Sequence, residues 1–306
     1  MKEQNLTEEE YLKNHIQQTE GKKEVTKTVS VTVDNSTTEN LKYFAFDVRE
    51  FPCGDFYPVG STIQIRAAEV KEIQGYSMVD NENYYDIVDK MNEMLSSCVR
   101  VKYPDGSIGS YMDIRDSDRF YLIFTIRELT FQQGNTLVTK ATCSCGNEVQ
   151  IDLKRTNFRN IEISDKIKRF YDPSKRCFTF ETTNGNVYHL APPRIGLQKA
   201  FTEYIVKENA EKRKPNLSFL KIIPFLLFDR TTITQEGIKA KLDEFTSMGN
   251  DSFQFLNSAV ELISLGIEKV SSNCSCGLEV HSDMIFPDGA SAVFVISNAF
   301  DKFIKK

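Results

Sequence analysis

Cys143-Ser144-Cys145-Gly146 occurs a second time in the chain, as Cys274-Ser275-Cys276-Gly277. The first copy continues as Asn-Glu-Val-Gln-Ile-Asp and the second as Leu-Glu-Val-His-Ser-Asp, so polar and apolar residues alternate after both. Such alternation is typical of β-strands, and the glycine supplies the backbone freedom that a tight turn needs. The repeat therefore predicts two β-hairpins with a cysteine pair at each tip, which we call the knuckles (residues 143–146 and 274–277).

Two cysteine pairs supply the four thiolates that a structural Zn²⁺ binds in a tetrahedron. We therefore predict one zinc site made of Cys143, Cys145, Cys274 and Cys276. One residue separates the cysteines of each pair, whereas zinc ribbons commonly have at least two. Two other interpretations stay open: free reduced thiols, or a Cys-x-Cys redox pair, although no neighbouring cation or helix start would lower the pKa of its thiols. His281 is a further potential ligand.

The composition is that of a globular protein. The chain has 306 residues, of which 40% are hydrophobic and 26% charged, with a net charge of −5. This acidic balance argues against a general nucleic-acid binder, and no apolar run reaches the length of about eighteen residues that a membrane span needs. The first twenty residues are polar, so we expect no signal peptide. Seven cysteines, four of them in two pairs, favour a reducing compartment and a metal over a disulfide framework.

We expect an α+β protein with three parts. Residues 1–40 form an extended N-terminal arm, and residues 41–165 and 166–306 form two related α+β units, each ending in a zinc-knuckle hairpin. Both units repeat one order of elements: an opening hairpin, a helix that begins at an aspartate, a glycine and a knuckle. The expected hairpins are 56–66 and 178–190, and the expected helices are 119–129 and 251–265.

A two-fold relationship between the units would bring the knuckles together. One Zn²⁺ would then join chain segments roughly 130 residues apart, and the closure of a long loop is where such a clip stabilises most in principle. Asp116 and Asp118 are expected to cap the helix that follows them, so capping explains the cluster that they form with Asp113 better than metal binding or acid–base chemistry.

No catalytic arrangement is evident. The chain contains no glycine-rich phosphate loop, nucleophile elbow or metalloprotease histidine pair. His189 lies in an expected strand, where a hydrogen-bonded structural role is the preferred interpretation. A Zn²⁺ with four thiolates has no open position for a substrate. We therefore expect neither enzymatic activity nor a small-molecule substrate.

The arm contains one strand-like segment. Val25, Val29, Val31 and Val33 alternate with serine and threonine, so the segment predicts a β-branched strand with no evident core of its own. It is either an ordinary edge strand or a strand that pairs with the sheet edge of a neighbouring subunit. The long polar segment before it favours the second interpretation, so these four valines are the candidate partner-binding residues.

Several motifs follow one another in a fixed order along the chain. They are a Pro-x-Gly-x-Phe-Tyr-Pro turn (52–58), an Ile-x-Ile-Arg strand (63–66), a Leu-x-x-Cys-Val helix end (95–99), an Asp-Arg-Phe-Tyr-Leu helix that runs into Arg-Glu-Leu (118–129), and a Cys-Gly knuckle followed by Val-x-Ile-Asp-Leu (149–153). This ordered set resembles the T4-type bacteriophage baseplate hub family, tail proteins of contractile phages. The resemblance covers about residues 41–303 and leaves out the arm. The family commonly has two residues between its knuckle cysteines, where this chain has one.

The resemblance implies a structural subunit of a contractile-tail baseplate, at the hub or inner baseplate, that is assembled in the host cytoplasm and carried in the virion. It implies other tail and baseplate proteins as partners, no catalysis, and no nucleic-acid or membrane partner. The alternative is a zinc-ribbon-type adaptor that binds nucleic acid or a polymerase, which the net charge of −5 and the few basic clusters around the knuckles argue against.

Overall fold

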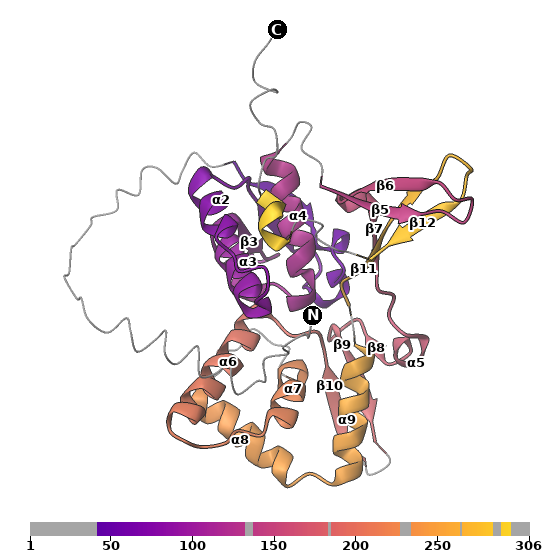
Figure 1. Cartoon of the computed structure of the whole chain (residues 1–306). Helices are drawn as coiled ribbons and strands as arrows, with labels where there is room; N and C mark the ends of the chain where they lie inside the picture. Colours follow the sequence, from indigo (N-terminus) through magenta and orange to yellow (C-terminus); the bar gives the residue numbers. More distant parts are fainter. Residues whose placement is uncertain are drawn as a thin grey trace, which may run out of the picture.

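A computed structural model describes residues 42–131, 137–182, 185–226, 234–263, 265–283 and 289–294. The predicted arm, with Val25, Val29, Val31 and Val33, lies outside these residues, and its role stays a prediction. Within them the chain combines α-helices with antiparallel sheets, as the α+β class predicts (Figure 1). No helix in the described part is both long and apolar enough to cross a lipid bilayer.

The N-terminal part is a four-stranded sheet covered by helices. The strands lie in the order β1-β2-β3-β4, namely Phe44–Asp47, Thr62–Ile65, Val99–Lys102 and Ile108–Gly109. Ile63 and Ile65 alternate with half-buried neighbours along β2, so one face of the sheet enters the core. Helices α2 (Val70–Ser77) and α3 (Tyr84–Cys98) pack against each other, and the Asn83 side chain caps α3.

Helix α4 (Arg119–Thr130) is the central helix of this part. Tyr121, Leu122, Ile123, Phe124 and Ile126 are all buried, so the helix is covered on most sides, as its apolar sequence predicts. Short 3-10 turns lie before it: η2 (Val48–Glu50), η3 (Gly54–Phe56), η4 (Tyr111–Asp113) and η5 (Asp116–Asp118).

The middle of the chain forms a second group of elements. A three-stranded sheet has the order β10-β9-β8, namely Val187–Leu190, Cys177–Glu181 and Tyr171–Asp172, preceded by the short helix α5 (Asp165–Lys168). Four helices follow: α6 (Ile195–Ala210), α7 (Leu217–Leu226), α8 (Gln235–Thr246) and α9 (Asn250–Leu262). Figure 1 shows this helical group at the opposite end of the molecule from α2, α3 and α4.

The two hairpins project together from one side of the molecule, at the level of the N-terminal group and on the right in Figure 1. The first consists of β5 (Val138–Thr142) and β6 (Glu148–Asp152), and the second of β11 (Ile267–Asn273) and β12 (Glu279–Ser282). The turn η6 (Arg155–Asn157) leads into β7 (Phe158–Asn160), which pairs with β11. This sheet therefore takes strands from both sides of the boundary predicted between residues 165 and 166.

The end of the described chain returns to the N-terminal group. The turn η7 (Ala290–Phe294) packs on α2 and α4, where the Phe294 ring lies 4.9 Å from the Tyr76 ring and 6.4 Å from the Phe131 ring. The buried Arg127 guanidinium donates a hydrogen bond to the carbonyl oxygen of Val293. The last described segment thus completes the core that the first segment begins.

The structure corrects three local predictions. Residues 56–66 do not form a hairpin, because β2 pairs with β1 and β3 instead. Helix α9 begins at Asn250 and ends at Leu262, where residues 251–265 are predicted, and no side chain caps its first turn. The Asp118 side chain does not cap α4, because it accepts hydrogen bonds from Cys53 and Tyr57 in the core.

Candidate metal centre

The two knuckles have the same backbone geometry. Gly146 and Gly277 have φ angles of +89° and +87°, and the N–H of each donates a 2.9 Å hydrogen bond to the carbonyl of the first cysteine of its knuckle. The N–H of Cys143 bonds to Asn147, and the N–H of Cys274 bonds to Leu278, each at 2.9 Å. A positive φ costs glycine little and other residues more, which explains why glycine closes both turns.

The hairpins approach each other reciprocally. Strand β6 lies against β11, and β5 lies against β12. The sulfurs follow the same rule: Cys143 Sγ lies 3.6 Å from Cys276 Sγ, and Cys145 Sγ lies 3.7 Å from Cys274 Sγ. The first cysteine of each knuckle therefore faces the second cysteine of the other, which is the pattern of a local two-fold axis.

The four sulfurs fit a tetrahedral metal site. All of them lie within 4.8 Å of one another, and we call this set the thiol cluster. A tetrahedron with Zn–S bonds of about 2.3 Å has sulfur–sulfur edges of about 3.8 Å, close to the two cross-hairpin distances. Four sulfur ligands suit zinc better than magnesium or calcium, which prefer oxygen. The predicted ligands thus lie close enough to hold one metal ion.

Backbone amides favour a thiolate in this cluster. The N–H of Cys276 points at the sulfur of Cys274 and lowers the pKa of that thiol to about 6. The N–H of Asn147 acts in the same sense on Cys145, but hydrogen bonds to the other thiols hold the Cys145 proton and raise its pKa to about 12. Backbone amides therefore favour the thiolate form of Cys274, which is the form of cysteine that a metal ion binds.

The tips have little apolar packing of their own. A small hydrophobic cluster joins Cys143, Cys274 and Val280 to the half-buried Ala141 and Val149. Ile151 and Val270, nearer the base of the hairpins, belong to the main core. The hairpins are thus anchored at the base by hydrophobic burial, whereas the thiol cluster and a 3.5 Å hydrogen bond from the Asn147 amide to the Ser275 hydroxyl join their tips.

Cations on and beside the hairpins are paired with acids. Lys140 binds Glu148 at 2.7 Å, Lys154 binds Asp152 at 3.2 Å, and Arg159 reaches across from β7 to Glu279 at 2.7 Å. Arg155 binds Glu128 at 2.8 Å, and Lys269 lies 3.7 Å from Glu268. Positive and negative side chains therefore lie side by side around the hairpins.

A second polar centre lies in the core, and the sequence did not predict it. The Asp118 carboxylate accepts hydrogen bonds from the N–H of Cys53 at 2.9 Å and from the Tyr57 hydroxyl at 2.7 Å. The Tyr57 hydroxyl in turn accepts a 2.8 Å bond from the N–H of Arg115. Burial raises the pKa of Asp118 to about 6 and lowers the pKa of the Arg115 guanidinium.

Arg115 connects the N-terminal part of the chain with its middle part at this centre. Its guanidinium donates to the carbonyl oxygens of Phe56 at 2.7 Å and of Pro192 at 2.6 Å. Backbone bonds from the N–H of Asp116 to Pro193 and from the N–H of Ile195 to Ile114 flank it. We call Tyr57, Arg115 and Asp118 with these backbone partners the buried joint.

The aspartates predicted as helix caps therefore have other partners. Asp118 belongs to the buried joint, Asp116 pairs with Arg119 at 2.5 Å, and Asp113 pairs with the buried Arg194 at 3.0 Å. The sequence offers one signal for this centre: Tyr57 and Asp118 belong to two of the motifs that carry the family resemblance, residues 52–58 and 118–129. His189 bonds to Thr179 at 3.0 Å, as its predicted structural role requires, and the exposed His281 is not part of the thiol cluster.

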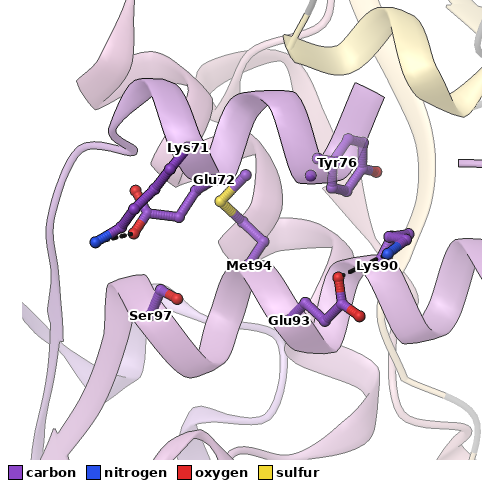
Figure 2. A pocket seen from close by; sticks show the side chains of 8 residues that line it. Lys71, Glu72, Tyr76, Lys90, Glu93, Met94 and Ser97 are labelled. Carbon is purple, nitrogen blue, oxygen red and sulfur yellow. Dashed lines mark hydrogen bonds and ion pairs between the residues drawn. The ribbon is translucent and has the colours of Figure 1, made fainter. Parts of the chain in front are cut away.

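Two cavities lie away from the cluster. Figure 2 shows the cleft of about 240 Å³ between α2 and α3, where Lys71 turns toward Glu72 and Lys90 toward Glu93. Glu72 also binds Arg66 at 2.8 Å, so the charges along this cleft are directed at one another. A cavity of about 350 Å³ lies between α3 and α6 and is lined by charged, polar and aromatic side chains.

Comparisons with protein-family models, with curated proteins and with solved structures found no match to this chain.

Proposed function

We propose that the chain is a structural subunit of a phage contractile-tail baseplate, stabilised by one structural Zn²⁺ that the thiol cluster binds. The observation that carries the zinc proposal is the convergence of four sulfurs, within 4.8 Å, from two hairpins of matching geometry. Cys143 and Cys276 are 133 residues apart in the chain, so one metal would close a long loop. The matching knuckles also support the proposal that two related units each end in a zinc knuckle.

The role of Zn²⁺ in this proposal is structural. Four thiolates occupy all positions of a tetrahedral ion and leave none for water or substrate. The small hydrophobic cluster at the tips buries little apolar area, so a metal would supply stability that packing there does not. The protein acts through assembly and not through catalysis.

The baseplate proposal rests on the ordered motifs and on how they contact one another. The turn at residues 52–58 and the helix that begins at residue 118 meet at Asp118, which binds Cys53 and Tyr57. The end of that helix binds the segment after the first knuckle, because Glu128 accepts hydrogen bonds from the N–H and Nε of Arg155 at 2.7 and 2.8 Å. Motifs that are distant in the sequence thus form one framework.

Other tail and baseplate proteins are the partners in this proposal. Exposed apolar side chains supply contact surface, with Met78 73% and Tyr84 61% exposed. The valines of the predicted arm would add a strand to the sheet of a neighbour. The paired charges around the hairpins disfavour the alternative, a zinc adaptor that binds nucleic acid.

Metal analysis tests the clip. We expect mass spectrometry to find one zinc per wild-type chain, little or none in Cys274→Ser, and one in Ser144→Ala, whose exposed serine lies between two ligands. A wild-type protein without metal would contradict the clip. The assembly role is tested separately, by quantitative proteomics of purified phage particles. Stoichiometric presence in tails is expected, and absence from them would contradict a virion subunit.

A further inference from the structure

The four cysteines of the thiol cluster differ in exposure. Cys145 and Cys276 are exposed, whereas Cys143 and Cys274 are only 4% and 5% exposed. Each exposed sulfur lies against a buried sulfur of the other hairpin, Cys145 against Cys274 at 3.7 Å and Cys276 against Cys143 at 3.6 Å. An accessible sulfur beside a protected one is the arrangement in which an oxidised cysteine is resolved by a second cysteine.

We propose that the thiol cluster is also an oxidation site, at which hydrogen peroxide converts the four thiolates into two crossed disulfides, Cys145–Cys274 and Cys143–Cys276. The inference rests on the proposed function, because a zinc clip in a phage particle leaves the reducing host cytoplasm with that particle. Both crossed bonds join the same hairpins as the metal. The clip therefore becomes covalent when Zn²⁺ is released.

The chemistry needs only peroxide and protons besides the protein. The thiolate of an exposed cysteine attacks one peroxide oxygen, an S–O bond forms, the O–O bond breaks, and the departing hydroxide takes a proton and leaves as water. The thiolate of the facing buried cysteine then attacks this sulfur, so that the S–S bond forms and a second protonated hydroxide leaves as water. Formation of each disulfide transfers two electrons from two thiolates to one hydrogen peroxide. Formation of the second disulfide removes the last two thiolate ligands and releases the metal.

The geometry favours crossed bonds over bonds within one knuckle. The hydrogen bonds of Gly146 to Cys143 and of Cys143 to Asn147 hold the first turn, and a bond between Cys143 and Cys145 has to distort it. Crossed bonds leave both turns in place and close loops whose ends are 129 and 133 residues apart. The other three cysteines, Cys53, Cys98 and Cys177, are fully buried and serve as internal controls.

Peptide mapping of the full-length, zinc-loaded protein tests the proposal. After treatment with two equivalents of hydrogen peroxide, non-reducing digestion should recover both crossed disulfides, while a chelating dye detects the release of one zinc per chain. Cys53, Cys98 and Cys177 should stay reduced. Disulfides within the knuckles, or sulfinic acid at Cys145 and Cys276 without crossed bonds, would overturn the inference.

Two double variants give a matched comparison. Cys145→Ser with Cys274→Ser leaves the facing pair Cys143 and Cys276, whereas Cys143→Ser with Cys274→Ser leaves the two exposed cysteines, Cys145 and Cys276. Both lose one ligand from each hairpin, so both lack the four-thiolate metal site, and urea denaturation of each reduced variant checks that it is folded. We expect the first to form its disulfide several-fold faster, and equal rates would contradict the assignment of facing pairs.

The same mapping separates the two proposals. Wild-type protein that contains zinc but forms no crossed disulfides would leave the clip standing and remove the oxidation site. Wild-type protein without zinc that forms crossed disulfides would remove the clip and retain the facing pairs.

Discussion

The thiol cluster and the buried joint both connect parts of the chain that are distant in sequence, and they do so by opposite means. The thiol cluster lies at the tips of projecting hairpins, with two of its cysteines exposed and a small hydrophobic cluster beside it. At the buried joint, Asp118 is 0% and Arg115 6% exposed, and the hydrogen bonds end on side chains and backbone in the core.

The difference is the reason why we propose a metal at only one of the two sites. In the core, hydrophobic burial brings the segments together, and polar groups need only satisfy one another. At the hairpin tips the hydrophobic cluster is small, and a metal bound by four thiolates would add a strong local bond between the two turns. The thiol cluster and the buried joint should therefore respond separately to mutation, pH and metal removal.

The largest expected effect is the loss of Arg115. Arg115→Met leaves the carbonyls of Phe56 and Pro192 without this donor and leaves Asp118 without its neighbouring cation, so we expect a loss of about 3–5 kcal/mol in the free energy of unfolding. Urea denaturation measures it. The control is Arg49→Met, because Arg49 pairs with Asp47 at the surface with its side chain 81% exposed and should change nothing measurable. Equal midpoints for both variants would contradict a structural role for the joint.

The second prediction concerns pH. Burial raises the pKa of Asp118 to about 6, above its value of about 3.9 in an unfolded chain. Between these values the folded state holds the proton that the unfolded state has released, so stability falls as pH rises from about 4 to about 6, by on the order of 3 kcal/mol. Asp118→Asn cannot ionise there. The difference in unfolding free energy between the two proteins should therefore change with pH across this window, and a constant difference would contradict it.

We expect the proposed zinc site to respond to pH in the opposite sense. Zinc ligands must be deprotonated, so acid should release the metal and destabilise the tips, whereas acid relieves the buried charge of Asp118. Local probes can therefore separate the two junctions within one titration. Amide exchange of β5, β6, β11 and β12 should rise as pH falls, after correction for the intrinsic rate.

Removal of the metal should have a smaller and more local effect. A free zinc concentration of 100 times the dissociation constant stabilises the folded state by about 2.7 kcal/mol, and a chelator removes this contribution. We expect hydrogen exchange to increase in residues 137–153 and 267–282 and to stay unchanged around residues 53–57 and 113–118. Uniform loss of protection would mean that the two junctions unfold together.

The sequence predicts the thiol cluster but not the buried joint. A repeated Cys-Ser-Cys-Gly stands out in a single chain because thiols at fixed spacing have few other uses, and the knuckle glycines predict the turns. The helix over residues 119–129, the pairing of residues 178–190 and the α+β class also followed from periodicity and turn residues.

The buried joint was not predictable, because its groups have common local uses. An aspartate before a helix caps that helix more often than it accepts hydrogen bonds from a distant tyrosine, so the sequence predicts that Asp118 is a helix cap. Nothing in the sequence places Arg115 beside the carbonyls of Phe56 and Pro192, since tertiary packing alone brings them together. Residues 56–66 were assigned to a hairpin for a similar reason: a short alternating strand does not reveal its partner.

The smallest effect tests whether the two knuckles are equivalent. Gly146 and Gly277 have φ angles of +89° and +87°, and a Cβ at either position meets nothing within 4 Å, so alanine there is strained only by its backbone. We expect Gly146→Ala and Gly277→Ala each to cost about 1–2 kcal/mol and to weaken zinc binding equally. Gly75→Ala, in α2 with open space around it, is the control and should stabilise by about 0.5–1 kcal/mol. Unequal losses for the two knuckle variants would break the local two-fold relationship, because a shared metal with reciprocal contacts makes the two turns energetically alike.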